Sequence, residues 1–210
     1  MGKFIVAGLI LGFLIPVLAE PGRNVEDLRT FSSVEPHEIV LLNSGIASFQ
    51  QRLLAIEEAH QSIDVEYFLY QDDLSGRIFT NALIKKAREG VKIRVLIDAP
   101  PFLWKIKEYH AKVLKEFDIE VKFYNAVSVV GKPAQAQHRN HRKLMVIDGK
   151  VALLGGRNIA DRYFDMELGF NFLDRDILIR GPIVSKIKRN FEAFWGDKLS
   201  EIIVAEPPQP

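Results

Sequence analysis

A histidine and a lysine that can act together on a phosphate group lie two residues apart in the second half of the chain. His141 and Lys143 are followed by Asp148 and then by Gly155-Gly156 and Asn158. A neutral imidazole is a nucleophile, and an ammonium group can bind the oxygens of a phosphodiester. These residue types and spacings suit phosphodiester chemistry that needs no metal ion.

The residues between Lys143 and Asp148 indicate how the first two side chains are held. Leu144 to Ile147 form an uninterrupted apolar run, typical of a strand buried on both faces of an α/β protein. Residues two apart on a strand share a face, so His141 and Lys143 are expected to point into one pocket. The sequence therefore makes a nucleophile and a phosphate clamp neighbours.

The elements around this strand predict a single α/β domain. Asn43 or Ser44 is a plausible N-cap for a helix, Gly90 ends a second helix, and Asp148-Gly149-Lys150 signals a hairpin turn. The strand before and the strand after the second helix form a parallel βαβ unit. The sum is a mixed, mostly parallel sheet flanked by helices. We expect helices over 46–56, 75–89, 105–117 and 184–195, and strands over 63–70, 91–98, 119–124, 143–148, 151–154 and 177–179.

Composition narrows the possible functions. The chain has 210 residues, a formal net charge of +1 and no cysteine. Cysteine chemistry is therefore excluded, and the near-neutral charge does not favour a broad nucleic-acid surface. Arg139, Arg142 and Lys143 nevertheless make a local basic loop around His141.

The amino-terminal segment predicts a location outside the cytoplasm. Residues 1–19 combine Lys3 with an apolar run and a small-residue end, as expected of a secretory signal peptide or an uncleaved membrane anchor. Residues 20–42 are interpreted as a linker, residues 43–200 as the domain, and residues 201–210 as a tail. An exported protein, periplasmic or associated with a membrane surface, is the expectation.

The motif and its surroundings resemble a known family. The run HRKLMVID followed by GGRN is similar to the HKD motif of the phospholipase D superfamily, and HRKLMVIDGKVALLGGRNIADRYFD is most similar to the first half of bacterial cardiolipin synthases and related phosphatidyltransferases. The resemblance extends from about Asn43 to about Trp195, through SIDVEYFLYQDDLSG, AREGVKIRVLID and DRDILIRGP. It implies the phospholipase D-like fold with one HKD motif.

The resemblance assigns a role to each motif residue. It implies that His141 attacks phosphorus to give a phosphohistidine while Lys143 holds the non-bridging oxygens. Asn158 can donate amide hydrogens to the same oxygens, and Gly155-Gly156 would let the backbone approach the phosphate. The matching position gives Asp148 the task of orienting a histidine. Neither a metal site nor another cofactor is expected.

One motif leaves the leaving group without its proton donor. His110 and Lys112 are no second copy, because they lie in a predicted helix, where residues two apart diverge. Family members supply a second histidine from a second motif or from a second chain, so we expect a homodimer or a partner chain with its own motif. A truncated half of a two-motif enzyme stays open.

Three functions follow, in order of preference. The first is a phospholipase D-type phosphodiesterase or phosphatidyltransferase, like cardiolipin synthase, acting on glycerophospholipids at a membrane surface. The second is an exported endonuclease with one motif, although nucleic acid is the disfavoured partner. The third is a catalytically silent half-enzyme.

Several other residues have competing interpretations. Glu66 is expected to face solvent rather than the site. Arg157 and Arg162 either contact a headgroup phosphate or pair at the surface. Tyr67, Phe68 and Tyr70 are expected to serve packing rather than ligand binding, and Asp72 and Asp73 to cap the helix after them.

Overall fold

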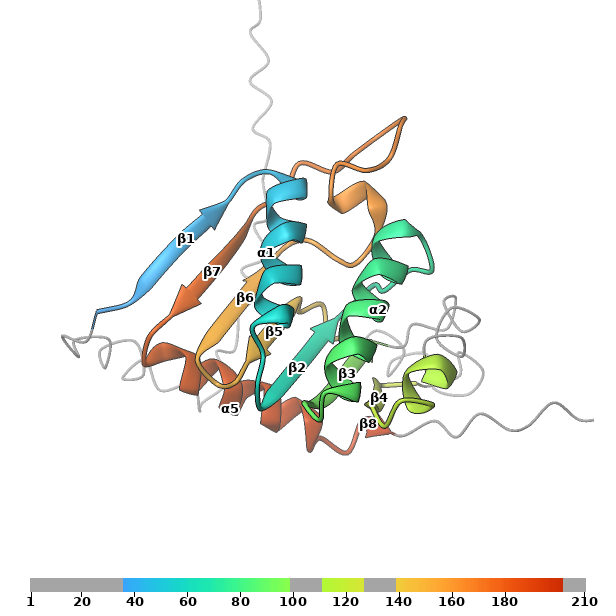
Figure 1. Ribbon diagram of the computed structural model, residues 1–210, viewed down its shortest axis with the longest axis vertical. Helices are drawn as coiled ribbons and strands as arrows, with labels where there is room; N and C mark the ends of the chain where they lie inside the picture. Colours follow the sequence, from blue (N-terminus) through green and yellow to red (C-terminus); the bar gives the residue numbers. More distant parts are fainter. Residues whose placement is uncertain (1–35, 99–110, 127–138, 202–210) are drawn as a thin grey trace, which may run out of the picture. The chain divides into compact units, whose positions relative to one another are not determined.

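The computed structural model describes residues 36–98, 111–126 and 139–201. These residues form an eight-stranded sheet in the order β1-β7-β6-β5-β2-β3-β4-β8 (Figure 1). The motif strand β5 lies near the centre of the sheet, between β6 and β2. The strands are β1 (Glu38–Leu42), β2 (Ser62–Tyr67), β3 (Lys92–Asp98), β4 (Glu120–Tyr124), β5 (Leu144–Ile147), β6 (Val151–Gly155), β7 (Asp176–Arg180) and β8 (Ser200–Glu201).

Helices cover both faces of this sheet. Helices α1 (Gly45–Glu57) and α2 (Leu74–Arg88) lie on one face, and α5 (Ile183–Trp195) lies on the other (Figure 1). Two hydrophobic clusters result, because side chains alternate along each strand. Phe49 and Phe79 of the first two helices belong to one cluster, and Phe191 of α5 belongs to the other.

Local signals fix the helix ends where the sequence predicted them. Ser44 accepts a hydrogen bond from the backbone of Ala47 and caps α1. Asp73 caps α2 in the same way through Gly76. Gly90 follows α2 with φ of +88°, a conformation that glycine adopts without steric cost.

The motif hairpin is confirmed. Strands β5 and β6 pair antiparallel, and Asp148 and Gly149 connect them with φ values of +52° and +65°. Lys150 completes this three-residue connection, and its backbone donates a 2.9 Å hydrogen bond to the carbonyl oxygen of Ile147. A turn with two positive φ angles at its centre matches the twist of the flanking strands. Aspartate tolerates this region better than most residues with a side chain.

The mixed α/β class is confirmed, but the balance of strand pairing differs from the expectation. Only β2–β3 and β3–β4 pair in parallel within the described sheet, and the other neighbours are antiparallel. Both edge strands were also missed. Strand β1 lies inside the stretch interpreted as linker, and β8 reaches Glu201, the first residue of the stretch interpreted as tail.

Several sequence-based expectations lie outside the residues described: the signal or anchor at 1–19, most of the linker, the first half of the helix at 105–117 and the loop at 127–138. Across the described ranges, no helix combines the length and apolar character needed to cross a membrane.

Candidate active site

The expected contact between His141 and Lys143 is present just before β5 begins. Lys143 Nζ lies 3.0 Å from His141 Nδ1 and donates a 2.6 Å hydrogen bond to the carbonyl oxygen of His141. The imidazole is exposed, whereas Lys143 is 5% exposed. The histidine is therefore accessible to a substrate, and the ammonium group lies beneath it.

Phe68 gives both groups an apolar wall. Its ring centroid lies 4.6 Å from that of His141, and Lys143 Nζ lies 5.3 Å from the ring centroid. Burial lowers the pKa of Lys143 to about 8, although the charges of Asp174 and Asp98 oppose the change. Burial, together with the charge of Lys143, also lowers the pKa of His141. A neutral imidazole beside a protonated amine is the favoured state near pH 7.

Asn158 is buried, and its amide orientation is fixed. Its Oδ1 accepts a 3.0 Å hydrogen bond from the backbone of Leu69, the residue after Phe68. The NH2 group of Asn158 makes no hydrogen bond to the residues that the structure describes. Donation from Asn158 to a phosphate oxygen stays a prediction.

Gly155 and Gly156 have no room for a side chain, because an aspartate lies against each of them. A Cβ at Gly155 would collide with the carboxylate of Asp176, and a Cβ at Gly156 would collide with the carboxylate of Asp174. Asp174 was missed by the sequence interpretation, although its charge acts directly on Lys143. The pair therefore brings acidic groups close to the backbone, which is a different reason from the predicted approach of a phosphate.

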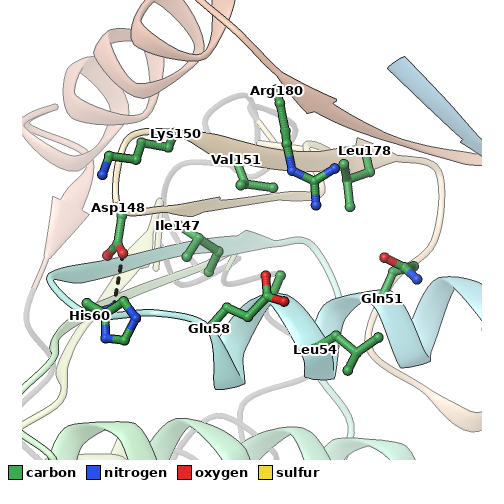
Figure 2. A pocket seen from close by; sticks show the side chains of 11 residues that line it. Gln51, Leu54, Glu58, His60, Ile147, Asp148, Lys150, Val151, Leu178 and Arg180 are labelled. Carbon is green, nitrogen blue, oxygen red and sulfur yellow. Dashed lines mark hydrogen bonds between the residues drawn. The ribbon is translucent and has the colours of Figure 1, made fainter. Parts of the chain in front are cut away.

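Asp148 lies at the opposite end of β5 from His141. A strand rises about 3.3 Å per residue, so the seven steps along the chain from His141 to Asp148 span on the order of 20 Å. The Asp148 carboxylate accepts hydrogen bonds from the backbones of His60, Gln61 and Ser62 at 3.0, 2.8 and 2.8 Å. Figure 2 shows it beside His60. Burial would raise its pKa, but these backbone bonds outweigh burial and lower it.

The position of Asp148 bears on the role that the sequence predicted for it. Both of its oxygens bind backbone N–H groups of the loop that enters β2, and among the described residues the Asp148 carboxylate makes no hydrogen bond to a histidine ring. The pocket beside it, of about 250 Å³, is lined by residues that include Glu58, Lys150 and Arg180 (Figure 2). The backbone contacts give Asp148 a structural role in this chain, and its expected role in orienting a histidine stays a prediction.

Buried carboxylates hold the basic loop around His141. Glu66 is 1% exposed, which corrects the expectation that it faces solvent. It pairs with Arg142 at 2.8 Å, and Asp98 pairs with Arg139 at 3.1 Å. Strand alternation places Glu66 on one face of β2, but it does not reveal that arginines from a distant loop cover that face.

Arg157 is also buried, so it is not available for a headgroup. Its guanidinium donates to the carbonyl oxygens of Leu42 and Asn43 at 3.1 and 2.6 Å. It also lies 3.4 Å from Asp176, which pairs with Arg52 at 3.0 Å. This buried network fixes the backbone of the GGRN segment.

Tyr67 and Tyr70 are buried core residues. Among the residues described, no group of three or more histidine, cysteine, aspartate or glutamate side chains is arranged to hold a metal ion. The groups shown to meet at the site are an imidazole, an ammonium group and the ring of Phe68, and the charges of Asp174 and Asp98 act on the ammonium group.

Comparison with known proteins identifies the family of this arrangement. The family model described as "Cardiolipin synthase, PLD-like domain" matches residues 53–195, which is more than half of the chain. The chain belongs to the phospholipase D superfamily. The fold agrees, since Nuc from Salmonella typhimurium, a phospholipase D family member, superposes with a TM-score of 0.59 at 14% identity, over 80% of this chain and 97% of that one.

Two cardiolipin synthases are similar in sequence. The enzyme of Geobacillus kaustophilus is 32% identical over 81% of this chain and 35% of its own length. Cardiolipin synthase C of Escherichia coli is 31% identical over 73% of this chain and 34% of its own length. The chain thus spans about a third of the length of the curated relatives it matches.

Proposed function

We propose that the protein is a phospholipase D-type phosphodiesterase or phosphatidyltransferase that acts on glycerophospholipids through His141. The contact between His141 and Lys143 carries this proposal, because it combines a neutral nucleophile with a buried cation at one accessible point. The similarity to cardiolipin synthases supports a lipid substrate at a membrane surface.

The chemistry begins with an exchange of partners. A bound phosphodiester offers anionic oxygens to Lys143, which then releases His141 Nδ1. The imidazole attacks phosphorus, the bond to the leaving oxygen breaks, and a phosphohistidine forms. Lys143 stabilises the charge that accumulates on the oxygens, and we propose that Asn158 donates to them as well. Water or an alcohol then displaces the histidine.

The leaving oxygen needs a proton that one motif does not supply. We propose that a second copy of the chain, or a partner with its own motif, contributes the second histidine across a twofold axis. Light scattering of the purified protein tests this arrangement. An active species with twice the mass of one chain is expected, and an active monomer would contradict it.

The arginines beside His141 weaken the endonuclease alternative. Arg139 and Arg142 are paired with the buried carboxylates of Asp98 and Glu66, so they cannot both neutralise a nucleic-acid backbone without losing those partners. Buried carboxylates thus neutralise two of the three positive charges in the basic loop that the sequence suggested. A DNA substrate remains the comparison that decides between the two functions.

The decisive experiment offers labelled phosphatidylglycerol and DNA separately to the wild-type protein. Lipid turnover and an acid-labile phosphorus adduct at His141 in quenched samples are expected. His141→Ala should lower the rate of lipid turnover by several orders of magnitude. His60 lies near the other end of the sheet, so His60→Ala should keep the wild-type rate. Turnover without an adduct under any quenching condition would refute the covalent step, and lipid binding without turnover would favour the silent half-enzyme.

A further inference from the structure

Glu66 has an unusual set of partners for a buried carboxylate. It lies on β2 between Leu96 of β3 and Leu144 of β5, and it is 1% exposed. Its Oε1 accepts from Asn140 Nδ2, and its Oε2 accepts from Arg142 Nη2 at 2.8 Å. One carboxylate therefore binds the residue before His141 and the residue after it.

Further contacts make this a rigid attachment. Asn140 Oδ1 accepts a 3.3 Å hydrogen bond from the backbone of Arg142, and the Asn140 backbone donates to Asp98. The Arg142 guanidinium also lies 4.2 Å from the ring centroid of Phe194 on α5. The chain on both sides of His141 is thereby tied to β2, β3 and α5.

His141 itself uses none of these contacts. Its ring contacts Phe68 and Lys143, while the side chains on either side of it bind Glu66. Fixing both neighbours restricts the backbone from which the imidazole projects. The ring can then meet Lys143 and an incoming phosphorus atom in one orientation.

Stability alone gives a weak reason for such a group. Burial raises the pKa of Glu66, and the charge of Arg142 together with the Asn140 hydrogen bond only partly offsets the cost of burial. Buried ion pairs can often be replaced by apolar side chains without loss of stability. A carboxylate at this place is better explained by the loop that it holds.

We propose that Glu66 is a positioning residue, which holds His141 in its reactive orientation by binding Asn140 and Arg142 together. The inference rests on the proposed function for its kinetic consequence, but its structural consequence can be measured without a substrate. Glu66 does not touch the reacting atoms, and it acts through the two residues that it binds.

The test compares Glu66→Gln with a matched control on the same strand. Asp64 is two residues away on the same face of β2, is equally buried, and pairs with Arg94 at 2.7 Å. Asp64→Asn therefore removes a buried charge of the same kind without affecting the loop. The first measurement is the set of imidazole resonances of His141 in histidine-labelled protein, assigned by their loss in His141→Ala.

Glu66→Gln should shift or broaden the His141 resonances, and Asp64→Asn should leave them in place. If the protein turns over lipid, Glu66→Gln should lower kcat about 10- to 100-fold with little change in KM, because a small displacement of a catalytic group costs about that much. Asp64→Asn should change neither constant.

Arg142→Gln provides a second route if Glu66→Gln does not fold, since the Arg142 side chain is 27% exposed and tolerates replacement better. Unchanged His141 resonances in the folded variants would overturn the proposal. An equal change in Asp64→Asn would also overturn it, because the effect would then be general destabilisation. If the wild-type protein turns over no lipid, the proposed function is rejected, and the His141 resonances alone decide whether Glu66 positions His141.

Discussion

Replacement of Asp148 separates a structural aspartate from a catalytic one. Its carboxylate accepts three backbone hydrogen bonds, and its backbone has φ of +52°. Asp148→Asn retains one acceptor oxygen and tolerates this φ. Asp148→Gly removes the acceptor without steric strain, and Asp148→Ala removes the acceptor and adds strain. The three variants therefore divide the contribution of the side chain into two parts.

The magnitudes follow from these contacts. Hydrogen bonds of this partly exposed kind contribute about 1 kcal/mol each, so Asp148→Gly should cost about 3 kcal/mol and Asp148→Asn about 1 to 2 kcal/mol. A side chain in the left-handed region adds about 1 kcal/mol, which brings Asp148→Ala to about 4 kcal/mol. Urea unfolding at pH 7 measures each loss.

The pH dependence provides an independent check on the carboxylate. The pKa of Asp148 is lowered in the folded protein, so its stabilisation is complete above the unfolded value of 3.8 and is lost as pH falls through the folded value. The difference in stability between wild type and Asp148→Asn should therefore shrink in acid. Turnover per folded molecule should stay within about threefold of wild type for all three variants. A stable, folded Asp148→Asn protein that lost activity by orders of magnitude would refute the structural assignment.

Two further predictions concern the site itself. The pKa of His141 is lowered, so the acid decline of kcat/KM, which reports protonation of the nucleophile, should lie below the usual histidine value of about 6.5. The pKa of Lys143 falls to about 8, so loss of its charge should add a decline from about pH 8 to any loss caused by deprotonation of the second histidine. Lys143→Arg should move this added decline upward in the activity that remains, and an unmoved decline would assign it to another group. Gly156→Ala should collide with Asp174, and should lower stability by about 1 to 3 kcal/mol as well as kcat/KM. Gly169→Ala is the control, because a Cβ there has open space, and it should lower neither. Equal effects of the two variants on urea unfolding and on kcat/KM would contradict the role given to Gly156.

The sequence predicted those elements whose signals are local. The caps at Ser44 and Asp73, the glycine after α2 and the turn at Asp148 each act within a few residues. Strand β1 carried no such signal, because four of its five residues are exposed and its partner β7 lies far along the chain. An edge strand with little burial shows no alternation to detect.

The sequence pattern could not predict that the charged groups around the site are buried. Glu66 and Arg142 are 76 residues apart in sequence, so nothing near Glu66 announces its partner. Alternation assigns Glu66 to a face of β2, but only the packing of α5 and the motif loop shows that this face is closed. Buried carboxylates and their arginines are thus determined by tertiary structure.

The two aspartates near the motif show why spacing along a chain does not settle a role. Asp148 is tied to His141 by the spacing of the motif, yet the intervening strand carries it to the other end of the sheet. Asp174 is much farther along the chain, but β6 and β7 pair Gly155 with Asp176, and the backbone of Gly156 donates to Arg175. This register places Asp174 against Gly156, where its charge acts on Lys143. Strand register therefore selects the acidic group that acts on Lys143, and Gly156 provides the space for it.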